Sequence, residues 1–172
     1  MNETITPLFK EEEIAAKVSQ LADKINADYK GKQISVLAIL KGSVFFLADL
    51  LRRINVPVTI NFVELRSNKG TESMREVKVR FESDFSMEQK NVLIVEDIVD
   101  TGITLDYLIK RIELHKPSSI KICTLIEKPS RKKIDIKSDY LGFTIADYYI
   151  VGYGLDYNEH YRNLPFIGIL HK

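Results

Sequence analysis

Apolar residues recur in two rhythms along the chain, and together they predict alternating strands and helices. Short, continuous aliphatic runs suit strands that are buried on both faces, and they lie at 34–40, 92–95 and 120–126. Apolar positions spaced three or four apart predict amphipathic helices at about 10–29, at 44–53 and from Leu105 to Ile112. We therefore expect an α/β fold with a mostly parallel, twisted central sheet that is flanked by helices.

Further strands are expected at Val58–Leu65 and at Val77–Phe81, where apolar and charged residues alternate. The intervening stretch 66–76 is polar and has no periodic apolar face. The two strands are expected to form an antiparallel hairpin over the ligand edge of the sheet, and the residues alone leave a mobile lid and a plain loop equally open. The last core strands are predicted at Leu141–Ile145 and Tyr149–Gly152.

The stretch from Val92 to Leu105 is the one around which the rest of the chain is organised. A buried strand ends in Glu96 and Asp97, Asp100 follows, and Gly102 lies in the turn before the next helix. In a parallel α/β sheet, ligands bind at this kind of junction. An alternative is that Asp100 caps the helix while the strand-end carboxylates are solvated. Three carboxylates beside Thr-Gly-Ile-Thr in one turn favour a functional site.

The turn at 101–104 has the chemistry of a phosphate site. Its free N–H groups lie at a helix N-terminus, Gly102 lacks a Cβ, and Thr101 and Thr104 add hydroxyl donors. The strand-end carboxylates would repel the same phosphate, so they suit sugar hydroxyls or hydrated Mg²⁺. Asp100 lies between the two regions and is placed to exchange a proton. This is the arrangement that a phosphorylated sugar needs.

Composition narrows the classes of function. The chain has 172 residues, 45% of them hydrophobic, and a formal net charge of +1, which gives no general case for nucleic-acid binding. The single cysteine, Cys123, lies in an apolar run and is interpreted as a buried structural thiol. No signal-like or membrane-length apolar segment is present, so we expect a cytoplasmic protein without a membrane partner. The scattered histidines do not have the spacing of a zinc site.

Three further segments carry weaker signals. Lys41 and Gly42 follow a predicted strand and form a second possible anion site, although a solvated loop is as good an explanation. Lys128 ends another strand as a candidate ligand contact, although such a lysine is usually solvated. Tyr149 could stack on a flat heterocycle, although most aromatic residues simply pack.

The string from Val92 to Leu105 resembles the motif that binds phosphoribosyl diphosphate (PRPP) in type I phosphoribosyltransferases. Leu40-Lys41-Gly42, Glu127-Lys128-Pro129 and the segment from Val151 to Arg162 are similar, in order and separation, to the hypoxanthine-guanine phosphoribosyltransferases. The resemblance implies one domain over 1–172, with a small hood from the N- and C-terminal segments. It also implies a purine-salvage enzyme that joins a 6-oxopurine to PRPP and releases pyrophosphate.

The resemblance further implies a role for each matching residue. Asp100 would take the purine N7 proton. Glu96 and Asp97 would contact the ribose hydroxyls and place Mg²⁺, and Asp156 would serve a second magnesium. The remaining contacts would be Asp100, Thr101, Gly102, Ile103 (by its backbone) and Thr104 to the 5′-phosphate; Lys41, Gly42 and Arg162 to pyrophosphate; and Lys128, Tyr149 and Ile150 to the base.

The family also forms dimers and tetramers, often has a non-proline cis peptide in the Lys41–Gly42 loop, and closes a lid corresponding to 66–76. Arg66-Ser67 stands where that lid usually has Ser-Tyr, so its closing contacts are expected to differ. One hypothesis is that Arg66 contacts pyrophosphate in the closed state.

Overall fold

The computed structural model describes residues 3–67, 77–81 and 86–171, and of residues 66, 67 and 77–81 it describes the backbone alone. The elements are, in order, β1 (Thr4–Phe9), α1 (Glu11–Asp28), β2 (Ile34–Leu40), α2 (Val44–Leu51), β3 (Val58–Ser67), β4 (Val77–Phe81), β5 (Asn91–Val99), α3 (Ile103–Glu113), β6 (Ser119–Glu127), the 3-10 turn η1 (Pro129–Arg131), β7 (Tyr140–Thr144), β8 (Ile150–Val151) and β9 (Ile167–His171). The predicted helices and strands are confirmed, with shifts at some of their ends, except that the strand predicted in the core at Tyr149–Gly152 is β8 and belongs to the small second sheet.

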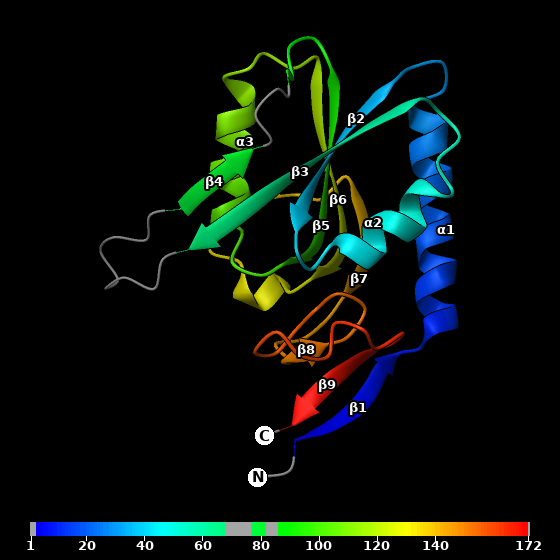
Figure 1. Cartoon of the computed structure of the whole chain (residues 1–172), viewed down its shortest axis with the longest axis vertical. Coiled ribbons are helices and arrows are strands. Elements are labelled where there is room, and N and C mark those ends of the chain that lie inside the picture. The colour runs from blue at the N-terminus through cyan, green and yellow to red at the C-terminus, as the bar shows by residue number, and fades with distance from the viewer. Residues whose placement is uncertain (1–2, 68–76, 82–85, 172) are drawn as a thin grey trace.

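The larger sheet has six strands in the order β4-β3-β2-β5-β6-β7 (Figure 1). All neighbouring strands are parallel except β3 and β4, which pair antiparallel with Leu65 opposite Val79. The predicted hairpin is therefore confirmed. Most of the predicted lid, residues 68–76, and the side chain of Arg66 lie outside the described residues.

Helices cover both faces of this sheet, as the continuous apolar runs predicted. Along β5, Leu93 and Val95 pack in the cluster that includes α1 and α2, whereas Val92 and Ile94 pack in the cluster that includes α3. All four side chains are at most 1% exposed. The strand is thus anchored by apolar contacts on both sides, and this anchoring fixes the position of its polar end.

The hood is a second, antiparallel sheet in the order β1-β9-β8. It joins the two ends of the chain, with Ile5 opposite Leu170 and Ile150 opposite Ile169. The predicted hood is confirmed, but the sequence did not indicate that Thr4–Phe9 and Ile167–His171 are strands. In Figure 1 this small sheet lies below the carboxyl ends of the central strands.

Two smaller expectations can be compared with the structure. Cys123 is fully buried, and burial raises the pKa of its thiol, which confirms a structural cysteine. In the part of the chain that the structure describes, no helix combines the length and the apolar character that a membrane crossing requires.

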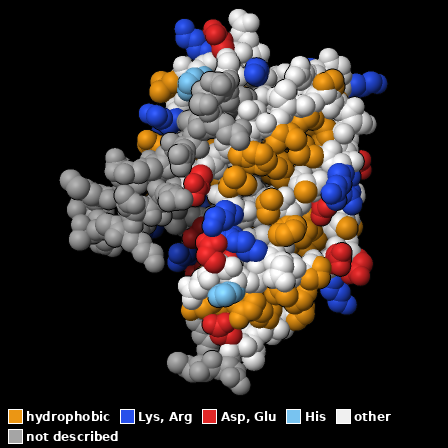
Figure 2. All heavy atoms as spheres, viewed as in Figure 1, with side chains coloured by type: hydrophobic (Ala, Val, Ile, Leu, Met, Phe, Trp, Pro, Cys, Tyr) orange, Lys and Arg blue, Asp and Glu red, His pale blue; other side chains and the backbone are white. Residues whose placement is uncertain are grey.

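The molecular surface has one face rich in apolar side chains. In Figure 2 hydrophobic side chains gather over the region of β3 and α2. The exposed large hydrophobic residues of these two elements are Val44, Phe45 and Ile60, each more than 40% exposed.

We expect Ile94→Ala to lower the free energy of unfolding by about 2–5 kcal/mol, because it leaves a cavity beside α3 at the centre of the sheet. Leu114→Ala is the control, since Leu114 is 74% exposed, and its cost should be within about 0.5 kcal/mol. Urea denaturation of both variants measures the two costs. Equal losses would show that β5 is not the tightly packed centre.

Candidate active site

The junction between β5 and α3 has the geometry that its sequence predicted. Gly102 has φ +79° and precedes the first helical residue. A Cβ at Gly102 would lie 2.9 Å from the carbonyl oxygen of Ile134, so the backbone angle and the close approach both favour glycine. Asp100 is not the capping residue, because Gly102 occupies that position. The capping alternative for Asp100 is therefore wrong.

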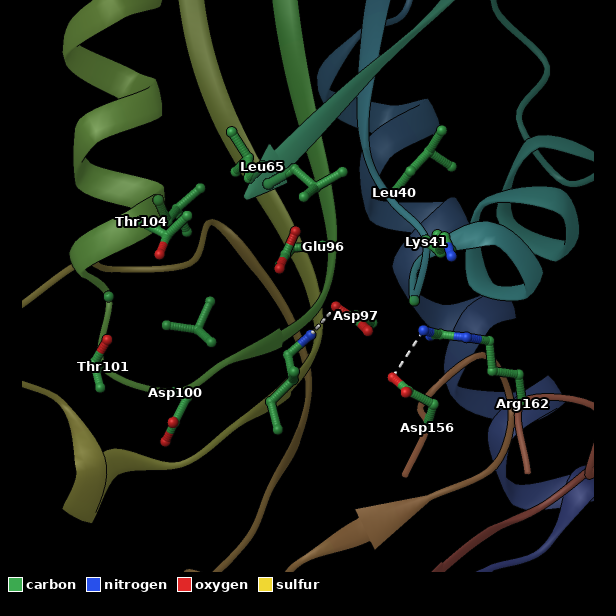
Figure 3. A pocket seen from close by; sticks show the side chains of 16 residues that line it. Leu40, Lys41, Leu65, Glu96, Asp97, Asp100, Thr101, Thr104, Asp156 and Arg162 are labelled. Atoms are coloured by element: carbon green, nitrogen blue, oxygen red, sulfur yellow. Dashed lines mark hydrogen bonds and ion pairs between the residues drawn. The ribbon is translucent and has the colours of Figure 1, made fainter. Parts of the chain in front are cut away.

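A cavity of about 290 Å³ opens beside this junction, at the carboxyl ends of β2 and β5. Figure 3 shows one side of it formed by Asp100, Thr101 and Thr104, the opposite side by Lys41, Asp156 and Arg162, and the space between them flanked by Glu96 and Asp97. Gly42 and Gly102 also line it. The crossovers of the parallel sheet bring the ends of β2 and β5 to one edge, and the segment between β8 and β9 adds Asp156 and Arg162.

The Lys41–Gly42 loop is in close contact with its neighbours. A Cβ at Gly42 would lie 1.6 Å from Oδ2 of Asp97, and a Cβ at Gly154 would lie 2.0 Å from the carbonyl oxygen of Gly42. The Leu40–Lys41 peptide bond is cis, as the family resemblance implied. This loop is therefore not a solvated turn; it is packed between the end of β5 and the C-terminal segment.

The two strand-end carboxyls are held in a poorly solvated environment. Burial, together with the neighbouring charge of Asp97, raises the pKa of Glu96 well above its ordinary value. Burial also raises the pKa of Asp97 to about 6, and the N–H of Ile98, which donates to Asp97 at 2.9 Å, partly offsets that rise. Glu96 and Asp97 are only partly exposed, so they are not the fully solvated carboxylates of the alternative.

These groups fit a magnesium ion that keeps part of its water. Oε2 of Glu96 is buried and has no hydrogen-bond partner among the described residues, so it is an oxygen available to a cation. Nowhere in the described ranges do three or more His, Cys, Asp or Glu side chains form a group that could hold a metal. Mg²⁺ commonly binds through one or two carboxylates plus substrate phosphates and water, and the pair Glu96 and Asp97, or Asp156 alone, suits that mode.

Cationic side chains at the far side of the cavity are paired with carboxylates. Arg162 lies 2.9 Å from Oδ1 of Asp156 and 3.4 Å from Oε2 of Glu159. Lys41 donates to the same oxygen of Glu159 at 3.0 Å. Lys41 and Arg162, which lie 121 positions apart in the sequence (162 − 41), thus converge on one carboxylate.

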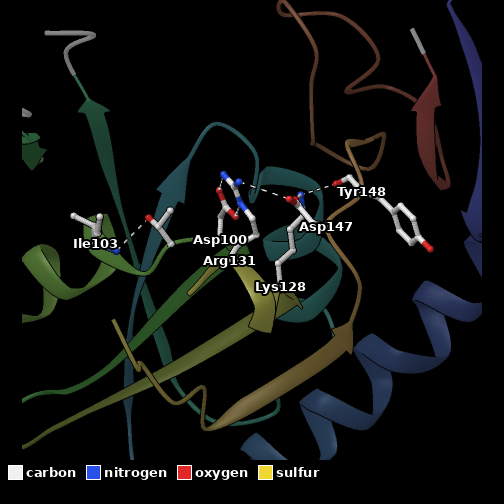
Figure 4. Close-up of polar contacts among 7 residues, drawn as sticks. Asp100, Ile103, Lys128, Arg131, Asp147 and Tyr148 are labelled. Carbon is white, nitrogen blue, oxygen red and sulfur yellow. Dashed lines mark hydrogen bonds and ion pairs between the residues drawn. The ribbon is translucent and has the colours of Figure 1, made fainter. Parts of the chain in front are cut away.

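A second series of ion pairs connects the loop formed by residues 100–104 to the end of β6 (Figure 4). Arg131 donates to Asp100 at 3.1 Å and lies 3.6 Å from Asp147. Lys128 donates to the backbone oxygen of Tyr148 at 2.5 Å and lies 3.5 Å from Asp147. Its side chain is 11% exposed, so the interpretation of Lys128 as a solvated lysine is wrong.

Main-chain hydrogen bonds connect the 100–104 loop and the end of β5 to β6 and the segment that follows it. Lys128 N donates to the oxygen of Val99 at 3.1 Å, and Lys133 N donates to that of Thr101 at 3.0 Å. The N–H of Ile103 points towards Oγ1 of Thr101, 3.4 Å away. These bonds hold the loop in its shape without a ligand.

The predicted base-binding residues lie apart from this cavity, since Lys128, Tyr149 and Ile150 are not among its lining residues. Tyr149 is 47% exposed and contacts the ring of Tyr157 edge-on at 5.4 Å between centroids. Ile150 has a buried side chain, and its backbone pairs within the hood. Tyr149 is thus half-exposed while it packs against Tyr157.

Comparisons with known proteins agree with this geometry. A family model described as the phosphoribosyl transferase domain matches residues 5–158. The chain belongs to the phosphoribosyltransferase family. It is 44% identical to the hypoxanthine-guanine phosphoribosyltransferase of Bacillus subtilis and 45% identical to that of Lactococcus lactis, over 95% of this chain and 91% and 89% of theirs.

Among solved structures of the family, the chain resembles a hypoxanthine-guanine phosphoribosyltransferase from Bacillus anthracis that holds a HEPES molecule in its active site. The TM-score is 0.92 at 45% identity, and the match covers 99% of this chain and all of that one. The type I phosphoribosyltransferase fold expected from the sequence is therefore confirmed.

Sequence reasoning did not single out three charged residues that pair with the predicted site residues: Arg131, Asp147 and Glu159. Arg131 and Glu159 lie three positions after Lys128 and Asp156, and Asp147 lies two positions before Tyr149. Their nearness to predicted site residues was a usable signal. The pairing itself could not be predicted, because it depends on how three separate segments pack.

We expect Gly42→Ala to raise the KM for PRPP sharply while the protein stays folded, because the new methyl group would displace the carboxylate of Asp97. Steady-state kinetics and thermal unfolding check this. Gly31→Ala is the control: no atom lies within 4 Å of its added Cβ, but its φ of +74° should cost about 1–2 kcal/mol of stability. A normal KM in Gly42→Ala would contradict the tight packing at Asp97.

Proposed function

We propose that this protein transfers the 5-phosphoribosyl group of PRPP to hypoxanthine, guanine or both in a Mg²⁺-dependent reaction, which gives IMP or GMP and pyrophosphate. The observation that carries the proposal is the cavity in which the 100–104 loop faces Lys41 and Arg162 across two carboxyls. One anion subsite lies on each side of a sugar-sized space. The sequence identity to hypoxanthine-guanine phosphoribosyltransferases over nearly the whole chain supports the same activity.

In this proposal PRPP spans the cavity. Its 5′-phosphate binds the N–H groups and hydroxyls of the segment 100–104, including the backbone of Ile103. Its ribose hydroxyls face Glu96 and Asp97. Its pyrophosphate lies between Gly42, Lys41 and Arg162, where two fixed cations attract the negative charge.

The proposed reaction exchanges the substituent on C1′ of the ribose. A base nitrogen forms the new bond to C1′, and the bond from C1′ to the pyrophosphate oxygen breaks. The electron pair leaves with pyrophosphate, where Lys41 and Arg162 stabilise the developing charge. The N7 proton of the purine passes to Asp100, whose carboxylate is held 3.1 Å from Nε of Arg131 before the base binds.

Magnesium, when bound, would neutralise pyrophosphate charge and help orient the ribose. Glu96 and Asp97 would hold one ion on the ribose side, and Asp156 would serve a second ion on the pyrophosphate side. The buried oxygen of Glu96 without a partner supports the first of these assignments.

Base selection is proposed to depend on the ends of β6 and β8. Lys128 would donate to the 6-oxo group, and adenine would be rejected because its 6-amino group is itself a donor. Tyr149 would stack on the purine, and the backbone of Ile150 would contact its edge. The low exposure of Lys128 supports its role, because a desolvated donor discriminates more strongly than a solvated one.

The proposal extends to the organisation of the protein. Asp156 and Arg162 come from the segment between β8 and β9 and line the same cavity as β5, which supports a single domain over 1–172. A homodimer or homotetramer and a cytoplasmic location are implied by the family resemblance. The apolar surface over β3 and α2 supports self-association.

The direct test is formation of nucleoside monophosphate from PRPP and Mg²⁺ with each of hypoxanthine, guanine, xanthine, adenine and uracil. We expect product with hypoxanthine or guanine and none without Mg²⁺. Turnover of uracil would instead indicate a pyrimidine enzyme. Binding of PRPP without product from any base would indicate a regulator that retains the fold.

We expect Asp100→Asn to keep PRPP binding and to lower kcat by about 10²–10⁴-fold, because the amide cannot accept the purine proton. Calorimetry with PRPP and initial-rate kinetics measure the two effects. Asp106→Asn is the control: Asp106 also pairs with a cation, Lys110 at 2.8 Å, but lies outside the cavity lining. An unchanged kcat in Asp100→Asn would exclude the proton transfer.

We expect Lys128→Met to raise the KM for hypoxanthine about tenfold to a hundredfold, the cost of one charged hydrogen bond, and to leave the KM for PRPP nearly unchanged. Selection against adenine should weaken in the same variant. Exposed Lys137 supplies the control, Lys137→Met. If the KM for PRPP rose instead, Lys128 would belong to a different subsite.

A further inference from the structure

Glu159 is the residue on which the two proposed pyrophosphate-binding cations converge. Its Oε2 accepts a hydrogen bond from Nζ of Lys41 at 3.0 Å and lies 3.4 Å from a guanidinium nitrogen of Arg162. The same guanidinium nitrogen also contacts Asp156 at 2.9 Å. A carboxylate oxygen therefore already occupies the position between two cations that an oxygen of pyrophosphate would be expected to take.

The backbone holds Glu159 in this place. Tyr157 and His160 pair across a tight antiparallel bridge, so Asn158 and Glu159 form its turn. Both have positive φ, +50° and +65°, which is unusual for residues with side chains. The N–H of Glu159 donates to Oδ2 of Asp156 at 2.9 Å, which ties the turn to the cavity wall.

The chemistry of these pairs favours an exchangeable contact. The side chains of Lys41 and Glu159 are 59% and 65% exposed, so water competes for their charges and this pair is weak. The side chain of Arg162 is less exposed, at 22%, but its contact with Glu159 is longer, at 3.4 Å. A more highly charged pyrophosphate group can displace such a carboxylate, and the carboxylate can return when pyrophosphate leaves.

We propose that Glu159 is a placeholder for pyrophosphate: it pairs with Lys41 and Arg162 in the free protein, yields them to PRPP, and takes them back on product release. This inference rests on the proposed function, because it uses the assignment of Lys41 and Arg162 to pyrophosphate. It adds a residue that touches neither the ribose nor the base. Glu159 positions the two cations and weakens the affinity for PRPP and pyrophosphate together.

The test is Glu159→Gln, which keeps the size of the side chain and removes its charge. We expect the KM for PRPP and the inhibition constant of Mg²⁺-pyrophosphate each to fall about two- to tenfold, because ligands no longer displace two ion pairs of Glu159. The KM for the base should stay unchanged. A general structural defect would not lower two constants for ligands of the same subsite while sparing the base.

The matched control is Glu113→Gln, which removes the same charge at the exposed far end of α3. It should leave all three constants unchanged. If Glu159→Gln leaves the PRPP and pyrophosphate constants at the wild-type values, or raises them, the placeholder is wrong while the transferase function stands. If the wild-type protein neither binds PRPP nor turns over any base, the proposed function itself fails.

A double-mutant cycle separates direct pairing from long-range repulsion. Binding of Mg²⁺-pyrophosphate is measured by calorimetry for the wild type, Glu159→Gln, Lys41→Met and the double variant. If Glu159 acts through Lys41, its substitution improves binding less in the Lys41→Met background. An equal improvement in both backgrounds would mean that the negative charge repels the ligand from a distance, and the placeholder would be refuted.

Discussion

The close approach of Gly42 to Asp97 is the constraint on which the rest of the site depends. There is no room for a Cβ at Gly42, because it would lie 1.6 Å from the Asp97 carboxylate, and Gly154 approaches Gly42 from the other side. Three segments that are distant in sequence thus meet at one point: the end of β2, the end of β5 and the C-terminal segment. Because β5 is anchored between two apolar clusters, the point of contact is fixed by the core.

A site for PRPP must hold cations and carboxylates a few ångströms apart without its ligand. The structure does so by pairing them locally. Arg131 and Lys128 share Asp147 beside the end of β6, and Lys41 and Arg162 share Glu159 at the far side of the cavity. Such pairs keep opposing charges oriented and can be exchanged for ligand contacts at small cost when they are exposed.

The sequence predicted most of the central fold, because buried strands and amphipathic helices leave local patterns. It could not predict that β1 and β9 pair, because Ile5 and Leu170 lie 165 positions apart in the sequence (170 − 5). Neither strand has a strong hydrophobic pattern of its own. The 100–104 loop could be predicted from a local pattern, as the core could, because its residues are contiguous in the sequence. Glu159 and Asp147 were missed because their roles arise from contacts between segments.

Glycine at position 102 has a second structural reason that the sequence did not indicate. The sequence argument gave Gly102 the task of letting phosphate approach the backbone. The structure adds that a Cβ there would meet the carbonyl oxygen of Ile134, in the loop that follows Lys128. That loop also donates two N–H groups, from Lys133 and Ile134, to the oxygen of Thr101. The close approach at Gly102 and these two hydrogen bonds therefore connect the 100–104 loop to the segment that follows Lys128.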